Sequence, residues 1–207
     1  MYSSPSPHEI EISIFGKGLG ECVVIHLGNG EWIIVDSFKD PYSKKPVALE
    51  YLKSINVNCT EAVKAVIATH WHDDHIRGLS EIVAECKSAV FICSEAMGRK
   101  EFLEFICSDA DLSESRPGIQ ELRNILEELK NKKASIQRAI ENRLLISDPR
   151  YKIFSLSPSD YAVSLAQKEI TVLLPKKLQP RVGISPIHPN NTAVVLLICV
   201  AGKSILL

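Results

Sequence analysis

A cluster of metal-ligand side chains constrains the fold of this 207-residue chain more than any other feature of its sequence. Three of its six histidines and two aspartates lie in the segment 70–75 (His-Trp-His-Asp-Asp-His), directly after the apolar stretch 63–68. Neutral imidazole and carboxylate are the ligands that suit zinc, manganese or iron. Without a cation among them, these groups would lose hydration at a strand end with nothing to replace it. The chain must therefore fold so that a strand end presents a metal site.

The spacing of these ligands predicts two adjacent ions. On an extended backbone, side chains two residues apart point to the same side, so His70 and His72 can share one ion. As the chain turns into a helix, Asp74 and His75 can face a second, neighbouring position. A cluster of ordinary polar surface residues is the alternative, but it leaves the density of ligands at a strand end unexplained.

The pattern of apolar residues predicts an antiparallel β opening followed by a layered α/β fold. Ile10, Ile12 and Ile14 alternate with polar residues, and Asn29-Gly30 is typical of a tight hairpin. Strand and helix then alternate, with helices expected at 47–52, 79–86 and 95–106 and strands at 65–68 and 89–93. Further on, we expect strands at 151–156, 170–174, 193–200 and 204–207, with a short helix after Ser157.

Residues 109–148 read as a helical insertion into this α/β pattern. A polar stretch at 109–118 precedes a long candidate helix at about 119–145, in which Leu122, Ile125 and Leu129 mark one apolar face. That face either packs on its own domain or docks a protein partner. Its lysines alternate with glutamates, which favours a solvated surface over a phosphate-binding one.

Composition excludes several classes of function. The formal net charge of -1 gives no general attraction to nucleic acid or to anionic lipid. No apolar stretch reaches the roughly 20 residues that a bilayer-spanning helix needs, so no membrane association is expected. The six cysteines are scattered singly, which predicts free thiols in a reducing cytoplasm. The sequence stops inside an apolar strand, and we expect the domain, a single one over 1–207, to continue beyond Leu207.

The segment His-Trp-His-Asp-Asp-His resembles the HxHxDH motif of the metallo-β-lactamase superfamily. The resemblance extends to residues 16–38, which include Asp36, and to residues 188–207, and it leaves out only about 109–148. Within the superfamily, the chain is most similar to the hydrolase domain of bacterial DNA-uptake (competence) channel proteins and its soluble relatives. The resemblance implies a four-layer αββα sandwich that holds its metals at the edge where the two sheets open.

The resemblance also implies roles for individual residues. His70 and His72 would bind the first metal, Asp74 and His75 would bind the second, and Asp36 would orient ligands by hydrogen bonding. The ions would be zinc, with manganese as the alternative. Asp74 and His75 would also be catalytic, because Asp74 can orient the attacking water and His75 can relay a proton.

Three further residues belong to the expected site. His188 stands where many family members place a third histidine for the first metal, although Asn190 and Asn191 compete for that place. Asn191 and Arg77 are candidate substrate-binding residues, since a guanidinium pairs well with phosphate, although Arg77 can equally form a surface salt bridge. The family's bridging aspartate and last histidine would both lie beyond Leu207.

These observations together predict a metal-dependent hydrolase that uses a metal-activated water. On the resemblance alone, the substrate is expected to be a phosphodiester, in a nucleic acid or a nucleotide. A hydrolase of small esters or lactones is the first alternative. The second is a catalytically degenerate fold that serves as a binding or regulatory module of a larger protein, docked through the helix at about 119–145.

Overall fold

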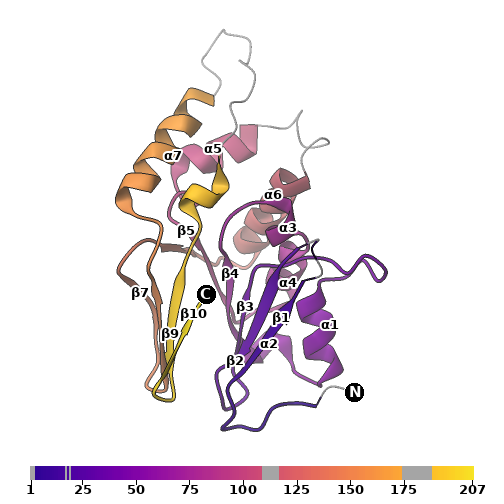
Figure 1. Ribbon diagram of the computed structural model, residues 1–207. Coiled ribbons are helices and arrows are strands. Elements are labelled where there is room, and N and C mark those ends of the chain that lie inside the picture. The colour runs from indigo at the N-terminus through magenta and orange to yellow at the C-terminus, as the bar shows by residue number, and fades with distance from the viewer. Residues whose placement is uncertain (1–2, 17, 19, 109–116, 174–187) are drawn as a thin grey trace.

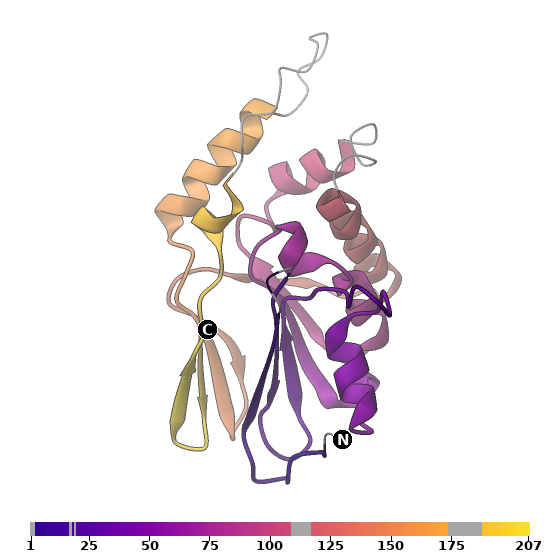
Figure 2. The same cartoon turned by 45° about the vertical axis from the view of Figure 1, so that its right-hand side comes forward.

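Two β-sheets face each other in the computed structural model, which describes residues 3–16, 18, 20–108, 117–173 and 188–207 (Figure 1). The first sheet has the strand order β1-β2-β3-β4-β5-β6, and the second has the order β10-β9-β8-β7. Helices cover the outer face of the first sheet, as both views show (Figures 1 and 2). The predicted layered α/β fold is confirmed.

The first sheet combines an antiparallel opening with a parallel half. Its antiparallel strands are β1 (Glu11–Phe15), β2 (Cys22–His26) and β3 (Trp32–Val35). Asn29 and Gly30 both have positive φ, 53° and 73°, which confirms the predicted tight turn between β2 and β3. The parallel strands β4 (Val63–Ala68), β5 (Val90–Ser94) and β6 (Ile136–Ala139) follow. The carboxyl ends of these parallel strands therefore lie at one edge of the sheet.

The second sheet is antiparallel throughout. It consists of β7 (Arg143–Ser147), β8 (Tyr151–Ser155), β9 (Leu196–Val200) and β10 (Lys203–Leu206). Its inner face packs against the first sheet through buried side chains such as Ile153 and Ile198, which meet Ile25, Ile33 and Ile67. Because β2 and β3 are covered on both faces, they are apolar at almost every position.

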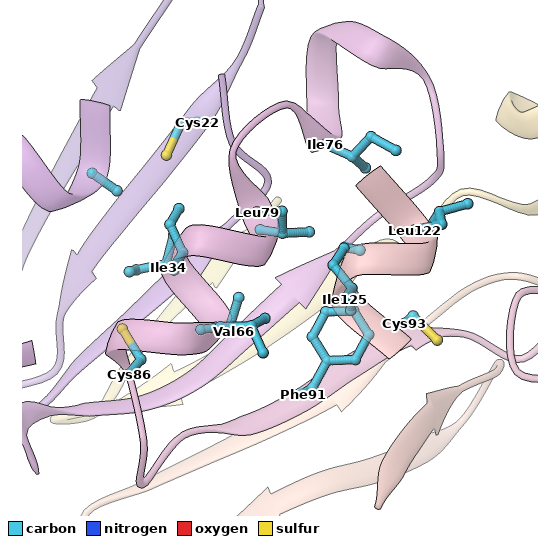
Figure 3. Close-up of a cluster of buried hydrophobic side chains, with 14 of the residues drawn as sticks. Cys22, Ile34, Val66, Ile76, Leu79, Cys86, Phe91, Cys93, Leu122 and Ile125 are labelled. Atoms are coloured by element: carbon cyan, nitrogen blue, oxygen red, sulfur yellow. The ribbon is translucent and has the colours of Figure 1, made fainter. Parts of the chain in front are cut away.

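Most of the helices pack on the outer face of the first sheet, and α7 (Asp160–Leu173) lies beyond one end of the second sheet. The helices are α1 (Val47–Ser54), α2 (Cys59–Ala62), α3 (Asp73–Ile76), α4 (Leu79–Glu85), α5 (Lys100–Ser108), α6 (Pro117–Asn131) and α7, with a 3₁₀ turn η2 (Pro189–Thr192). Figure 3 shows Leu79 and Ile125 of α4 and α6 meeting Val66 and Phe91 of the sheet. In both ribbon views, α7 stands beyond the end of the second sheet (Figures 1 and 2). None of the described helices is long and apolar enough to cross a bilayer.

The predicted helix at 119–145 is wrong in its second half. Helix α6 ends at Asn131, where Lys133 takes a positive φ of 55° and the Ala134 N–H donates to the Leu129 carbonyl oxygen. Residues 136–139 then form β6, which pairs with β5. The apolar residues after the turn have spacings of three and four, which imitate a helix, so periodicity alone could not place the boundary.

The apolar face of α6 is buried inside the domain. Ile119, Leu122, Ile125 and Leu129 all belong to the core that covers the first sheet. In addition, the Glu121 carboxylate accepts hydrogen bonds from the backbone N–H and the hydroxyl of Ser80, which joins α6 to α4. Of the two interpretations of this stripe, packing on its own domain agrees with the burial of these side chains, and docking of a protein partner through this helix stays a prediction.

The strand expected at 170–174 is also wrong, because residues 170–173 are the last turn of α7. The run Ile170-Thr171-Val172 is β-branched and favours a strand locally. However, Val163, Ala166 and Ile170 are buried at spacings of three and four, which is the pattern of a helix face. Tertiary packing of that face overrides the local preference.

Candidate metal centre

The histidine-rich segment follows β4 at the carboxyl edge of the parallel strands: residues 70–72 lie in the loop after β4, and Asp73, Asp74 and His75 form the first turn of α3, and we refer to the whole segment as the loop. Backbone hydrogen bonds hold it in place. The Glu21 N–H donates to the Asp74 carbonyl oxygen at 3.0 Å, and the Ser37 N–H donates to the His75 carbonyl oxygen at 2.7 Å. Two separate parts of the first sheet therefore fix the backbone of the loop.

Gly20 lets the turn after β1 approach this loop closely. Its φ is +152°, and a Cβ atom at this position would lie 2.5 Å from the Phe38 Cβ and 2.9 Å from the Asp74 carbonyl oxygen. No side chain fits in that space without moving backbone. The contact fixes the position of the loop at Asp74.

The loop brings three imidazole rings together. The ring centroids of His70 and His75 are 4.1 Å apart, and those of His70 and His72 are 4.9 Å apart. One potential ligand atom each from His70, His75 and Asp36 lies within 4.8 Å of the other two. His70 is buried, whereas His72 and His75 are partly exposed. The three predicted histidine ligands of the loop are therefore neighbours in space.

The Asp36 carboxylate anchors the loop from beneath. It is almost fully buried, with a positive φ of 57°, and it accepts three hydrogen bonds. The donors are the Thr69 backbone N–H at 2.7 Å, the Thr69 hydroxyl at 2.5 Å and the His75 Nδ1 at 2.8 Å. Because both carboxylate oxygens are already used, Asp36 is suited to orienting ligands rather than to ligating.

This network assigns the same tautomer to two imidazoles. His75 uses its Nδ1–H toward Asp36. The Thr69 hydroxyl has a single proton, which it donates to Asp36, so its oxygen accepts from the His70 Nδ1–H at 2.9 Å. In the neutral form, each ring then has its Nε2 lone pair unprotonated, which is the atom that a metal requires.

The surroundings shift the pKa values of these groups in different directions. Burial, followed by the neighbouring His75 and His72, lowers the pKa of His70 to about 4. The hydrogen bond to Asp36 raises the pKa of His75 against the opposing effect of burial. Burial raises the pKa of Asp36, and its hydrogen bonds to His75 and Thr69 oppose that rise. His70 is thus neutral at neutral pH, the state in which imidazole ligates.

Asp74 and Arg77 lie at the open side of the loop. The Asp74 side chain is 59% exposed, and its Oδ2 lies 3.8 Å from the His75 Nε2. Arg77 is 56% exposed, and its Nη2 lies 3.5 Å from the Asp73 Oδ2, one turn away on the same helix. The structure thus places Asp74 beside the imidazoles, and it places Arg77 in a surface ion pair.

His188 and Asn191 lie just before and in the 3₁₀ turn η2, which leads into β9 of the second sheet. His188 is exposed and precedes η2, where its carbonyl oxygen accepts the Asn191 N–H. The chain reaches the loop slightly further on, where the Val194 N–H donates to the Thr69 carbonyl oxygen at 3.0 Å. Within the described ranges, the His188 and Asn191 side chains make no recorded contact with the loop histidines, so their roles stay predictions.

Sequence reasoning missed Thr69 and Gly20. Thr69 joins Asp36 to His70 and therefore links two parts of the network. Its one sequence signal is a hydroxyl residue directly between a buried strand and the first histidine. Gly20 belongs to a glycine-rich turn whose closeness to Asp74 only the fold reveals.

The donor set fits a divalent metal. Imidazole nitrogens with their other ring nitrogen fixed by hydrogen bonds, next to an exposed carboxylate, are the arrangement found around catalytic zinc. His70, His72, Asp74 and His75 are the residues of the loop that could hold such an ion.

Comparisons with known proteins agree with this fold. The sequence description of the Metallo-beta-lactamase superfamily matches residues 16–130. A metallo-beta-lactamase from Cronobacter sakazakii with a mutated HARLDQ motif is similar in structure, with a TM-score of 0.51 and 13% identity, over 98% of this chain and 61% of that one. Metallo-beta-lactamase SMB-1 bound to 2-mercaptoethanesulfonate has a TM-score of 0.50 and 14% identity, over 99% of this chain and 63% of that one.

A third similar structure is MEM-A1, a subclass B3 metallo-beta-lactamase from a soil metagenome library. Its TM-score is 0.50 and its identity is 12%, over 99% of this chain and 62% of that one. The present chain therefore spans about three fifths of the length of these structures. No curated protein sequence matches it.

Proposed function

The chain belongs to the metallo-beta-lactamase superfamily, and on that premise we propose that it is a metal-dependent hydrolase. One observation carries this proposal. His70 and His75 stand side by side with both Nδ1 atoms committed to hydrogen bonds, which leaves both Nε2 atoms available as ligands. A histidine pair that served only to stabilise the fold would not need both rings held in the same tautomer.

His70 and His72 are proposed to hold the first of two divalent ions, and Asp74 and His75 the second. When bound, such ions supply an activated water at neutral pH and stabilise negative charge at the attacked centre. Zinc is proposed as the native metal, with manganese as the alternative, because imidazole and carboxylate suit both. His188 is proposed as a further ligand of the first ion.

The protein's own groups orient and move protons in this proposal. Asp36 and Thr69 keep His70 and His75 in the tautomer that presents Nε2. The exposed Asp74 carboxylate orients the attacking water and accepts its proton, since it lies at the open side of the loop. His75 donates its Nδ1–H to Asp36 and has its Nε2 3.8 Å from Asp74, so it is proposed to act in catalysis as a ligand of the second ion, and Asp74 is the group that passes the proton to the leaving group.

The proposed bond cleaved is a phosphodiester, in a nucleic acid or nucleotide. The resemblance to the DNA-uptake hydrolases supports this choice, and Asn191 and Arg77 are the proposed contacts to the substrate. The six cysteines are free thiols, which supports action in the reducing cytoplasm.

Metal analysis tests the metal centre. Purified protein should hold more than one equivalent of zinc or manganese, and the double variant His70→Ala/His72→Ala should lose most of it. His8→Ala, which removes an exposed histidine outside the site, is the matched control and should change nothing. Less than one equivalent, unaltered by the double variant, would show that the loop does not bind metal.

Substrate assays test the reaction. With zinc or manganese supplied, bis-p-nitrophenyl phosphate and single-stranded DNA should be hydrolysed, and Asp74→Asn should abolish that activity while leaving the fold intact. Hydrolysis of a lactone panel alone would replace the phosphodiester proposal with an esterase. Metal binding without any hydrolysis would favour a binding module.

A further inference from the structure

A second charged cluster lies at the carboxyl end of β5, outside the metal centre. The Glu95 side chain is only 7% exposed, and three arginines surround it. The Arg99 Nε lies 2.9 Å from the Glu95 Oε1, the Arg138 Nη1 lies 3.5 Å from the same oxygen, and the Arg143 Nη1 lies 3.3 Å from Oε2. Three guanidinium groups thus share one buried carboxylate.

The cluster has more positive charge than Glu95 can neutralise. Three arginines and one glutamate leave two positive charges. Across the described segments, no other carboxylate forms an ion pair with these guanidiniums. Glu101 and Lys100 follow Arg99 along α5 and add one charge of each sign. A single buried carboxylate needs one well-placed cation, so the second and third arginines exceed what burial of Glu95 demands.

The fold holds these arginines in place at the surface. A Cβ atom at residue 98 would lie 2.8 Å from the Arg138 Cδ, so Gly98 provides the space in which the Arg138 side chain lies. The Arg143 Nη1 also donates to the Arg138 carbonyl oxygen at 2.8 Å, which joins β7 to β6. The three side chains keep 40%, 46% and 45% of their surface exposed. A ligand in solvent can therefore reach the guanidinium N–H groups that do not face Glu95.

The arginine cluster and the metal centre occupy the same edge of the first sheet. Ala68 pairs with Cys93 in the parallel ladder, so the segment beginning at Thr69 and the segment beginning at Ser94 leave neighbouring strands side by side. Figure 1 shows the ends of β4 and β5 next to each other, with α5 beyond them. Neighbouring strands are about 5 Å apart, so the segments that carry His70 and Glu95 leave the sheet next to each other, and a ligand with more than one charged group is the kind that could contact both sites.

We propose that Arg99, Arg138 and Arg143 form a phosphate-binding site, with Glu95 holding the three guanidiniums together. A guanidinium presents paired N–H donors that match two phosphate oxygens, and several of them can surround one dianion. The ligand is a phosphate group, either free inorganic phosphate or a phosphate of a larger molecule. The further step, that this arginine site holds a second phosphate of the substrate beside the metal centre, rests on the proposed function.

Titration of the whole 207-residue chain with inorganic phosphate tests the site. The readout is the set of arginine Nε–Hε cross-peaks in ¹H–¹⁵N NMR spectra, recorded at constant ionic strength against chloride. A chelator is present, so phosphate cannot bind through metal, and the outcome is independent of hydrolysis. Three arginine cross-peaks should shift and saturate together.

Variants assign the binding to the cluster. Arg143→Gln should weaken phosphate binding about tenfold, a typical effect of losing one charge-assisted hydrogen bond. Arg150→Gln is the matched control, because Arg150 is a similarly exposed arginine that is ion-paired with Glu31 and Asp148 on another part of the surface. It should leave the affinity unchanged. If Arg143→Gln does not fold, Arg143→Lys keeps the charge and loses the paired donors, and it should also weaken binding.

Two results would overturn the proposal. One is the lack of any saturable shift of arginine signals in the folded wild-type chain. The other is equal phosphate affinity in the wild type and in a folded Arg143 variant. A short single-stranded oligonucleotide with a 5′-phosphate, compared with one lacking it, then distinguishes a substrate phosphate from free phosphate. Tighter binding of either oligonucleotide than of inorganic phosphate identifies the larger ligand, and tighter binding of inorganic phosphate than of both identifies free phosphate.

Discussion

Replacement of the buried Asp36 carboxylate by an amide tests the network that positions the proposed metal ligands. Asp36→Asn preserves size but puts an NH₂ group where one carboxylate oxygen accepted hydrogen bonds. If the amide oxygen faces the Thr69 hydroxyl and His75, the NH₂ group faces the Thr69 backbone N–H and leaves that donor unpaired. The reverse orientation leaves the His75 ring facing a donor instead.

Each orientation has a cost that can be estimated. A buried donor without a partner costs about 1–3 kcal/mol of unfolding free energy. For a chain of this size, 1 kcal/mol shifts the melting temperature by about 2–4 °C. An amide that donates to the His75 Nδ1 would also move the ring proton to Nε2, which removes a metal ligand. Loss of such an orienting partner lowers metal affinity by about 10–100-fold.

Two assays on Asp36→Asn check these values. Urea denaturation of metal-free protein measures the unfolding free energy, and competition with a chromophoric chelator measures zinc affinity. Glu104→Gln makes the same carboxylate-to-amide change in an exposed ion pair with Lys100 and should alter neither quantity. Wild-type stability together with wild-type zinc affinity in Asp36→Asn would refute the role given to this network.

Four further predictions concern the core, the loop, the metal and the thiols. Leu122→Ala should lower the unfolding free energy in urea by about 2–5 kcal/mol, because α6 is part of the core, whereas Glu127→Ala on the exposed side should have little effect. An equal effect of both would contradict the packing of α6. Gly20→Ala should weaken zinc binding measured by chelator competition, and unchanged binding would mean that the loop does not depend on this contact. Metal at 100 times its Kd should stabilise the folded protein by about 2.7 kcal/mol, so removal of the metal should lower the melting temperature. A melting temperature that metal does not alter would argue against a site in the native state. At pH 8, iodoacetamide should label the exposed Cys107 and not Cys93, whose pKa burial raises to about 12, as peptide mass spectrometry can check; rapid labelling of Cys93 would contradict its burial.

The sequence determined the parts of this protein that depend on neighbours along the chain. The hairpin at Asn29-Gly30 follows from the backbone conformations these residues tolerate, and most of the strand Val63–Ala68 follows from the continuous apolar run at 65–68. The histidine cluster could be predicted because its members lie within six residues, so one strand end and one helix start are enough to gather them. Family resemblance added Asp36, which no local pattern would have indicated.

Tertiary structure decided everything that joins distant segments. Asp36 meets Thr69 and His75 across 33 and 39 residues, and Glu95 meets Arg143 across 48. The end of α6 and the helical state of 170–173 were likewise settled by which side chains could be buried. Periodicity reports only which face of a segment is apolar, whereas the surface that covers that face depends on how the whole chain packs. For that reason the candidate ligands could be proposed from the sequence, but the groups that hold and surround them could not.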